Sequence, residues 1–130
     1  MSVFADDRAA IAEALEGTDN GWAVHDHLPG RAVPPCYIVL HDSPLVAREA
    51  TDPFGSATTR YEVWAVAGTG ANDVETASVE DATEAAIEAL MAAGFDFETV
   101  DQPVTFDLNG TQFLAISIHI TSSVRFTKGG

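Results

Sequence analysis

Hydrophobic and polar positions alternate strictly near the C-terminus, and this pattern organises the rest of the chain. Within Gln112–Phe126, four large aliphatic side chains take alternate positions, with Val124 further along the same side, and small, polar or aromatic side chains lie between them. A period of two predicts a long β-strand with one apolar face. Asn109-Gly110 precedes it, and Asn-Gly readily forms a two-residue hairpin turn, so Val104–Leu108 is expected to be the partner strand. The apolar face comprises Leu114, Ile116, Ile118 and Ile120.

Two amphipathic helices are predicted, and the second is the natural cover for that apolar face. The first, Val3–Glu16, follows Ser2 as N-cap and ends before Gly17. The second, Val79–Ala93, follows Ser78 as N-cap and ends at Gly94. Its apolar residues recur at helical spacing and form one stripe. That stripe comprises Val79, Ala82, Ala86 and Leu90, flanked by Ile87 and Met91.

Three more strands are predicted before the second helix, at Trp22–His25, Cys36–His41 and Thr58–Ala67. Cys36–His41 is apolar without alternation, which is typical of a central strand covered on both faces. In Thr58–Ala67 the residues alternate, with Tyr61, Val63 and Ala65 on one face and Arg60, Glu62 and Trp64 on the other. At 130 residues, with no internal repeat, the chain is expected to form a single α+β domain.

The segment Asp42–Ser56 shows neither a helical nor a strand period and is predicted to be a long loop. Loops of this length in a small domain are often functional, so we expect an arm that contacts a partner. The alternative is a passive, mobile connection. Arg48 and Phe54 within the loop, with Trp64 on the following strand, are the candidate interface residues. Asp73–Ala77 has no clear period, and Phe95–Asp101 is expected to lead into the final hairpin.

The charge balance argues against some classes of binding partner. Twenty acidic residues stand against six Lys and Arg, giving a formal net charge of −14. Such a surface repels phosphate, so binding to nucleic acid through basic patches is not expected, nor is attraction to anionic membranes. No apolar run is long enough to span a bilayer, and the N-terminus has no basic-then-apolar signal pattern. An acidic source proteome or salt tolerance would also explain the charge.

No constellation in the sequence predicts catalysis or a cofactor. His25-x-His27, joined by His41, would supply zinc ligands, but Leu28-Pro29-Gly30 places His27 in a turn, so strand-end histidines are expected instead. The lone Cys36 is expected to be a small buried hydrophobic residue. Ser122-Ser123 lacks a neighbouring base, and Gly68-Thr69-Gly70 is too short for a phosphate loop.

Glu80, Glu84 and Glu88 stand at four-residue spacing on the second predicted helix. A carboxylate metal site in a bundle would need paired Glu-x-x-His motifs, and this helix holds no His. A solvated helix face is therefore expected. The alternative is a face that lines an acidic channel in an oligomer.

The order of these pieces resembles the tail terminator (tail completion) proteins of long-tailed phages, including those of actinobacteria. The resemblance covers nearly the whole chain. It is carried by the opening Met1–Ile11 helix, Gly21–Pro29 with the following Pro-Pro and apolar strand, the Arg60–Val66 strand, the Ala-rich Val79–Ala93 helix and the final Phe113–Ile120 strand. It is a resemblance of element order and composition and includes no catalytic or ligand motif.

The resemblance implies a fold and a function. The fold would be a mostly antiparallel sheet packed against an N-terminal helix and a central amphipathic helix. The protein would form a hexameric ring at the head-proximal end of the tail tube, assembled in the host cytoplasm. Its partners would be other copies of itself, the tail tube protein and the head–neck connector, and it would have no enzymatic role. DNA would pass through the ring without specific binding.

Two other functions stay open at this point. One is another neck or head-closure protein of the virion, which would also form a closed ring. The other is an unrelated small α+β module that binds a partner or depends on a metal. A ring in solution favours the virion proteins, and a monomer with bound metal favours the module.

Overall fold

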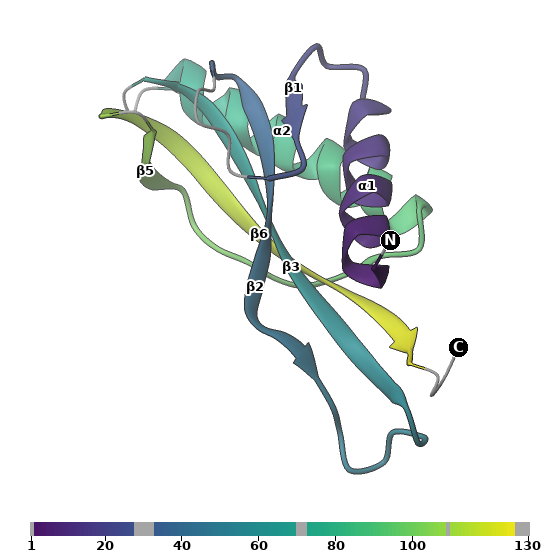
Figure 1. Ribbon diagram of the computed structural model, residues 1–130. Coiled ribbons are helices and arrows are strands. Elements are labelled where there is room, and N and C mark those ends of the chain that lie inside the picture. Colours follow the sequence, from purple (N-terminus) through teal and green to yellow (C-terminus); the bar gives the residue numbers. More distant parts are fainter. Residues whose placement is uncertain (1, 28–32, 70–72, 109, 127–130) are drawn as a thin grey trace.

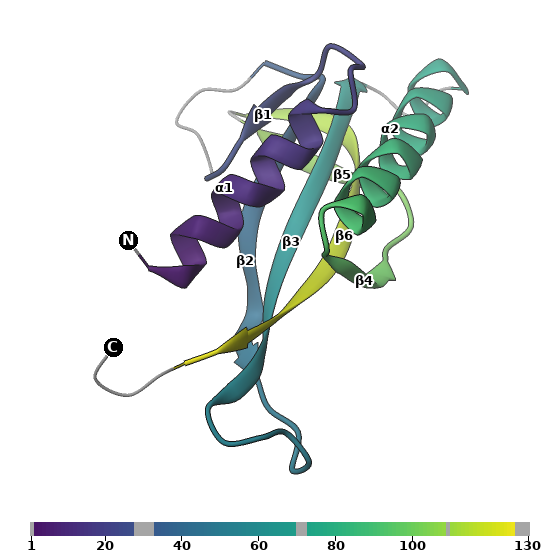
Figure 2. The same ribbon diagram turned by 90° about the vertical axis from the view of Figure 1, so that its right-hand side faces the viewer.

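The computed structural model describes residues 2–27, 33–69, 73–108 and 110–126, and it places two helices on one face of a six-stranded sheet (Figures 1 and 2). The spatial order of strands is β1-β2-β3-β6-β4, and β5 pairs with β6. Among the strand pairs of the described residues, β1–β2 is parallel and the others are antiparallel. The predicted α+β domain with a mostly antiparallel sheet is therefore confirmed. In chain order the elements are α1 (Val3–Glu16), β1 (Ala23–His25), β2 (Cys36–Ala47), β3 (Ser56–Thr69), α2 (Asp73–Ala92), β4 (Asp96–Val100), β5 (Val104–Leu108) and β6 (Thr111–Arg125).

Strand β6 is the long strand that the alternation predicts, and it pairs with three other strands. One edge pairs with β3 along nearly its whole length, from Thr69 opposite Phe113 to Ser56 opposite Arg125. The other edge is shared: β5 pairs with its first residues and β4 with residues further along. The turn into β6 is tight, because Leu108 pairs with Thr111 and Gly110 has a φ of 81°. Asn109 lies outside the described residues.

The core lies between the helices and the predicted apolar face of β6. Its sheet side includes all four residues of the predicted apolar face of β6, Leu114, Ile116, Ile118 and Ile120, together with Tyr37, Val39, Tyr61, Val63, Ala65 and Ala67. Ile11 and Leu15 of α1 and the predicted stripe of α2 complete it. Tyr37 fixes the sheet to α2, because its hydroxyl donates to the Ala82 carbonyl at 2.8 Å and accepts from Asn20. Met91 is 53% exposed, so the predicted contribution of that residue to the stripe is wrong.

Helix α1 begins after Ser2, whose hydroxyl accepts from the Ala5 N–H as predicted. Helix α2 instead begins at Asp73, so the prediction of a start at Val79 with Ser78 as N-cap is wrong. The first turn of α2 has no apolar period, because Val74 is exposed. Asp73 and Glu75 in that turn stabilise the helix through their interaction with the helix dipole. Glu75 also accepts a hydrogen bond from the Gly68 N–H at 2.6 Å, which fastens this turn to the end of β3.

The predicted loop Asp42–Ser56 is only partly a loop. Strand β2 continues to Ala47, and β3 starts at Ser56, so the connection is residues 48–55. The strand was missed because Pro44 interrupts it and the pairing with β3 shifts between His41 and Val46. Proline is tolerated at such a bulge and on a strand edge, and β1 pairs only with the first three residues of β2.

The sheet face opposite the helices carries a second, smaller apolar cluster. Cys36 and Ile38 of β2 lie in it, so this strand is covered on both faces as predicted. Trp64 packs against Phe106 of β5, with ring centroids 4.8 Å apart. Strand β4 was not predicted, because all five of its residues are exposed and leave no hydrophobic period.

Candidate functional site

Strands β2 and β3 extend beyond the helices as an arm, which Figures 1 and 2 show projecting from the body of the domain. The tip of the arm is residues 48–55. Next to the tip, the end of β6 pairs with the start of β3 and forms a third strand of the arm. Phe54 at the tip is 90% exposed, more than any other large hydrophobic side chain in the described part of the chain. An aromatic ring held this far into solvent is typical of an interface anchor.

Hydrogen bonds within the tip give it a defined shape. Asp52 and Glu49 close a turn, because the Asp52 carboxylate accepts from the Glu49 N–H and the Asp52 N–H donates to the Glu49 carbonyl. Arg48 donates to the Ser56 carbonyl at 2.8 Å and to the Pro53 carbonyl at 3.3 Å. Gly55 has a φ of 81°, and an added Cβ there would lie 2.7 Å from the Phe126 carbonyl oxygen. Phe54 is therefore presented by a braced turn.

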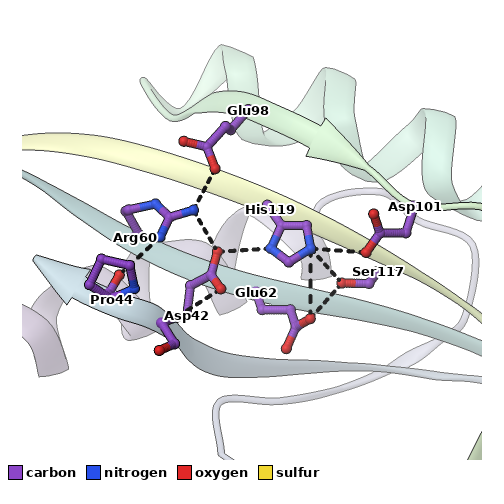
Figure 3. Close-up of polar contacts among 9 residues, drawn as sticks. Asp42, Pro44, Arg60, Glu62, Glu98, Asp101, Ser117 and His119 are labelled. Atoms are coloured by element: carbon purple, nitrogen blue, oxygen red, sulfur yellow. Dashed lines mark hydrogen bonds and ion pairs between the residues drawn. The ribbon is translucent and has the colours of Figure 1, made fainter. Parts of the chain in front are cut away.

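A polar network crosses four strands on the face of the sheet opposite the helices (Figure 3). His119 of β6 lies at its centre, with Nδ1 2.8 Å from Asp42 Oδ2 and Nε2 3.0 Å from Asp101 Oδ2. Arg60 of β3 lies beside it and pairs with Glu98 at 2.5 Å and with Asp42 at 3.5 Å. The network thus connects β2, β3 and β6 with β4 and the residue that follows it.

The network favours the charged form of both of its basic groups, Arg60 and His119. Burial acts to lower the pKa of His119, but the hydrogen bonds with Asp42 and Asp101 and the charges of Asp42 and Glu62 outweigh it, so the pKa is raised. The hydrogen bond with Glu98 raises the pKa of Arg60. An imidazolium that donates from both nitrogens to carboxylates acts as a cross-link between strands.

Ser117 contacts His119, and His119 contacts Asp42, as serine, histidine and aspartate do in a hydrolytic triad. Their hydrogen bonds do not suit that role. A triad histidine needs a free ring nitrogen to take the serine proton. Here Nε2 is 3.0 Å from Asp101 and 3.4 Å from the Ser117 hydroxyl, which itself donates to Glu62 at 2.7 Å. Ser117 is also only 1% exposed. The arrangement suits structural cross-linking of the sheet better than base catalysis.

The other residues considered for chemistry lie apart from one another. Strand β1 ends at His25, His27 follows it and bonds to Asp26 at 2.7 Å, and the His41 ring lies beside Tyr61. No group of three His, Cys, Asp or Glu within the described ranges is arranged to hold a metal ion. The Gly68 N–H, which a phosphate loop would offer to a ligand, is taken by Glu75.

The structure brings together two of the three predicted interface residues. Arg48 and Phe54 share the arm tip, whereas Trp64 lies further along β3 and is packed by Phe106. The sequence did not predict the His119 network, because its members come from strands far apart in the chain. One signal was present in the sequence. Arg60 and Glu62 share one face of the predicted strand, and charged side chains there need either ion-pair partners or water.

Neither helix in the described part of the chain is long and apolar enough to cross a membrane. In comparisons with known proteins, neither a protein-family model nor a curated protein sequence matches the chain.

Proposed function

We propose that the protein is a tail terminator, a structural virion protein of a long-tailed phage. In this function it forms a ring, expected to be hexameric, on the head-proximal end of the tail tube. The ring ends tube polymerisation and joins the tube to the neck connector. It is not an enzyme and needs no cofactor. The resemblance in element order supports this proposal, and so does the α+β architecture.

The arm is the observation that carries the proposal. An aromatic ring that is 90% exposed on a braced turn suits an assembling subunit, because the ring becomes buried when the tip contacts a neighbour. The arm also projects past the helices, so it can reach another subunit without disturbing the core (Figure 2). We therefore assign the tip, residues 48–55, to assembly.

The charge of the chain is compatible with DNA passing through the ring. With a net charge of −14, the subunit repels the phosphate backbone, so DNA would slide through without sequence-specific binding. Repulsion of this kind is strongest at low ionic strength. It requires that acidic side chains face the lumen.

Tube polymerisation tests the function. The purified chain is added to tail tube protein from the same phage while tubes grow, and tube lengths are measured by electron microscopy. We expect shorter tubes that carry a ring at one end. A variant with residues 48–55 replaced by a short Gly-Ser linker should stay folded but should not shorten the tubes relative to tail tube protein alone. Tubes of unaltered length with the unmodified chain would contradict the proposal.

A further inference from the structure

Strand β4 is an edge strand with little packing to hold it. All five of its residues are exposed, and in the described part of the chain it pairs with β6 alone. The pairing also shifts register between Phe97 and Thr99. A strand with few buried contacts opens locally at a lower free energy than the core does. Side-chain contacts that tie β4 to the sheet can therefore decide how often it opens.

Two side-chain contacts tie β4 to the face of the sheet opposite the helices (Figure 3). Glu98 of β4 pairs with Arg60 of β3 at 2.5 Å. Asp101, the residue that follows β4, has its Oδ2 3.0 Å from Nε2 of His119 on β6. The Asp101 N–H also donates to the Ser117 carbonyl at 2.9 Å. Asp101 is therefore held to β6 by both its side chain and its backbone.

The protonation state of His119 decides whether the second contact can form. A carboxylate oxygen faces each ring nitrogen, that of Asp42 at 2.8 Å from Nδ1 and that of Asp101 at 3.0 Å from Nε2. A carboxylate accepts hydrogen bonds, and a neutral imidazole has one N–H to donate. The neutral ring can therefore satisfy one of the two carboxylates, and its other nitrogen turns a lone pair toward the second.

Burial selects the carboxylate that the neutral ring loses. The Asp42 side chain is only 11% exposed, so it needs a hydrogen-bond donor where it lies. The Asp101 side chain is 56% exposed, so water can solvate it. Neutral His119 is therefore expected to keep its Nδ1–H on Asp42 and to present the Nε2 lone pair to Asp101.

The other charged groups around the ring act in the same direction. Glu62 of β3 lies 3.9 Å from Nε2, and the Ser117 hydroxyl already donates to it at 2.7 Å. When His119 loses its charge, Arg60 is the one cation left in the network. It is then surrounded by four carboxylates, which are Asp42, Glu62, Glu98 and Asp101. Repulsion between Glu62 and Asp101 across Nε2 favours the movement of Asp101 into water.

We propose that His119 is a proton-operated latch on β4. With both ring nitrogens protonated it holds Asp101 against β6, and when the Nε2 proton passes to solvent Asp101 is freed and β4 opens more often. The inference goes beyond the proposed function, because every part of the latch belongs to one chain. Opening uncovers the backbone of β6 from Ile118 to Thr121, an unpaired sheet edge that can accept another strand.

The latch is closed at low pH. The pKa of His119 is raised above its ordinary value of about 6.5, so the ring is charged near pH 6 and loses its proton as the pH rises through the raised value. Arg60 stays charged, since its pKa is raised as well. His41 precedes Asp42 in the chain, but its ring lies beside Tyr61, which belongs to the core on the helix side.

Amide hydrogen exchange of the full chain, followed by mass spectrometry from about pH 6 to about pH 9, tests the latch. Dividing the exchange rate of the denatured chain by that of the folded chain at each pH gives a protection factor and removes the direct effect of pH on exchange. We expect the protection of β4 to fall roughly fivefold as His119 loses its proton, which is the effect of one half-exposed ionic contact. Strand β5 pairs with β6 from Thr111 to Ala115, away from His119, and should keep its protection.

Asp101→Asn separates the latch from a general effect of charge. An amide can accept from charged His119 and can donate to the neutral ring, so the contact should survive the loss of the proton and the fall in β4 protection should disappear. Glu98→Gln is the matched control, because it weakens the other contact of β4 and leaves the latch in place. In Glu98→Gln and in His41→Gln the pH-dependent fall should remain.

The titration of the His119 ring, followed by NMR and assigned with His119→Gln, gives the midpoint that the fall in β4 protection should share. Protection of β4 that does not change over this pH range would overturn the latch, and so would a different midpoint or a fall that persists in Asp101→Asn. An equal fall in β5 would show that His119 acts on the whole sheet and would also overturn it. Since the measurement uses the isolated chain, none of these results bears on the proposed function, which tube growth tests separately.

Discussion

Replacing Ile118 by alanine tests whether the apolar face of β6 forms the core. Ile118 is fully buried, and it lies between Val63 of β3 and Val100 of β4 in the sheet. The change removes three carbon groups, worth about 0.8 kcal/mol each, or roughly 2.4 kcal/mol in transfer free energy. The cavity that remains adds to this, so the expected loss is about 2–5 kcal/mol.

The assay is urea unfolding followed by circular dichroism. A loss of this size is a large part of the roughly 5–15 kcal/mol that stabilises an ordinary domain, so the midpoint should fall clearly while the slope stays unchanged. Val104→Ala is the matched control, because Val104 is 36% exposed on β5, and it should change stability by no more than about 0.5 kcal/mol. A loss below about 1 kcal/mol for Ile118→Ala would refute this account of the core.

Four further predictions follow from the structure. Because the pKa of His119 is raised in the folded state, its stabilising contribution is complete below about pH 6.5 and is lost as pH rises through the raised value, so His119→Gln should cost more unfolding free energy near pH 6 than near pH 9. Tyr37→Phe removes the hydrogen bonds to Ala82 and from Asn20 and should cost about 1–3 kcal/mol in urea unfolding, whereas no change would show that these bonds are dispensable. The double change His25→Ala and His27→Ala should leave folding and assembly intact, and elemental analysis of the unmodified chain should find no stoichiometric zinc; one metal per chain would contradict this. Replacing residues 48–55 with a Gly-Ser linker should leave the urea midpoint nearly unchanged but yield monomers by light scattering, and persistent rings would show that the arm is a passive connection.

The fold could be predicted where burial imposed a period on the sequence. Strand β6 and the middle of α2 each place their large apolar residues in the main core on one face, so those residues recur at two and at about 3.6 positions. Three features had no such signal. The first turn of α2 is exposed at Val74, β4 is exposed throughout, and the second half of β2 contains Pro44 within a bulge. Propensity and burial gave no information at these positions.

The candidate site was predictable only in part. Phe54 and Arg48 were visible as an aromatic residue and a positive charge within an unpatterned segment, and the structure places both on the arm tip. The His119 network was not predicted, because its members come from strands far apart in the chain and no local pattern encodes the pairing that brings them together.

The oligomeric state of the purified chain tests the central claim most directly. Native mass spectrometry combined with negative-stain electron microscopy measures both the copy number and the symmetry of the assembly. We predict a closed cyclic oligomer, expected to have six copies, with a central opening. A chain that stays monomeric at every concentration and ionic strength tested, or that forms only a two-fold dimer, would contradict the account.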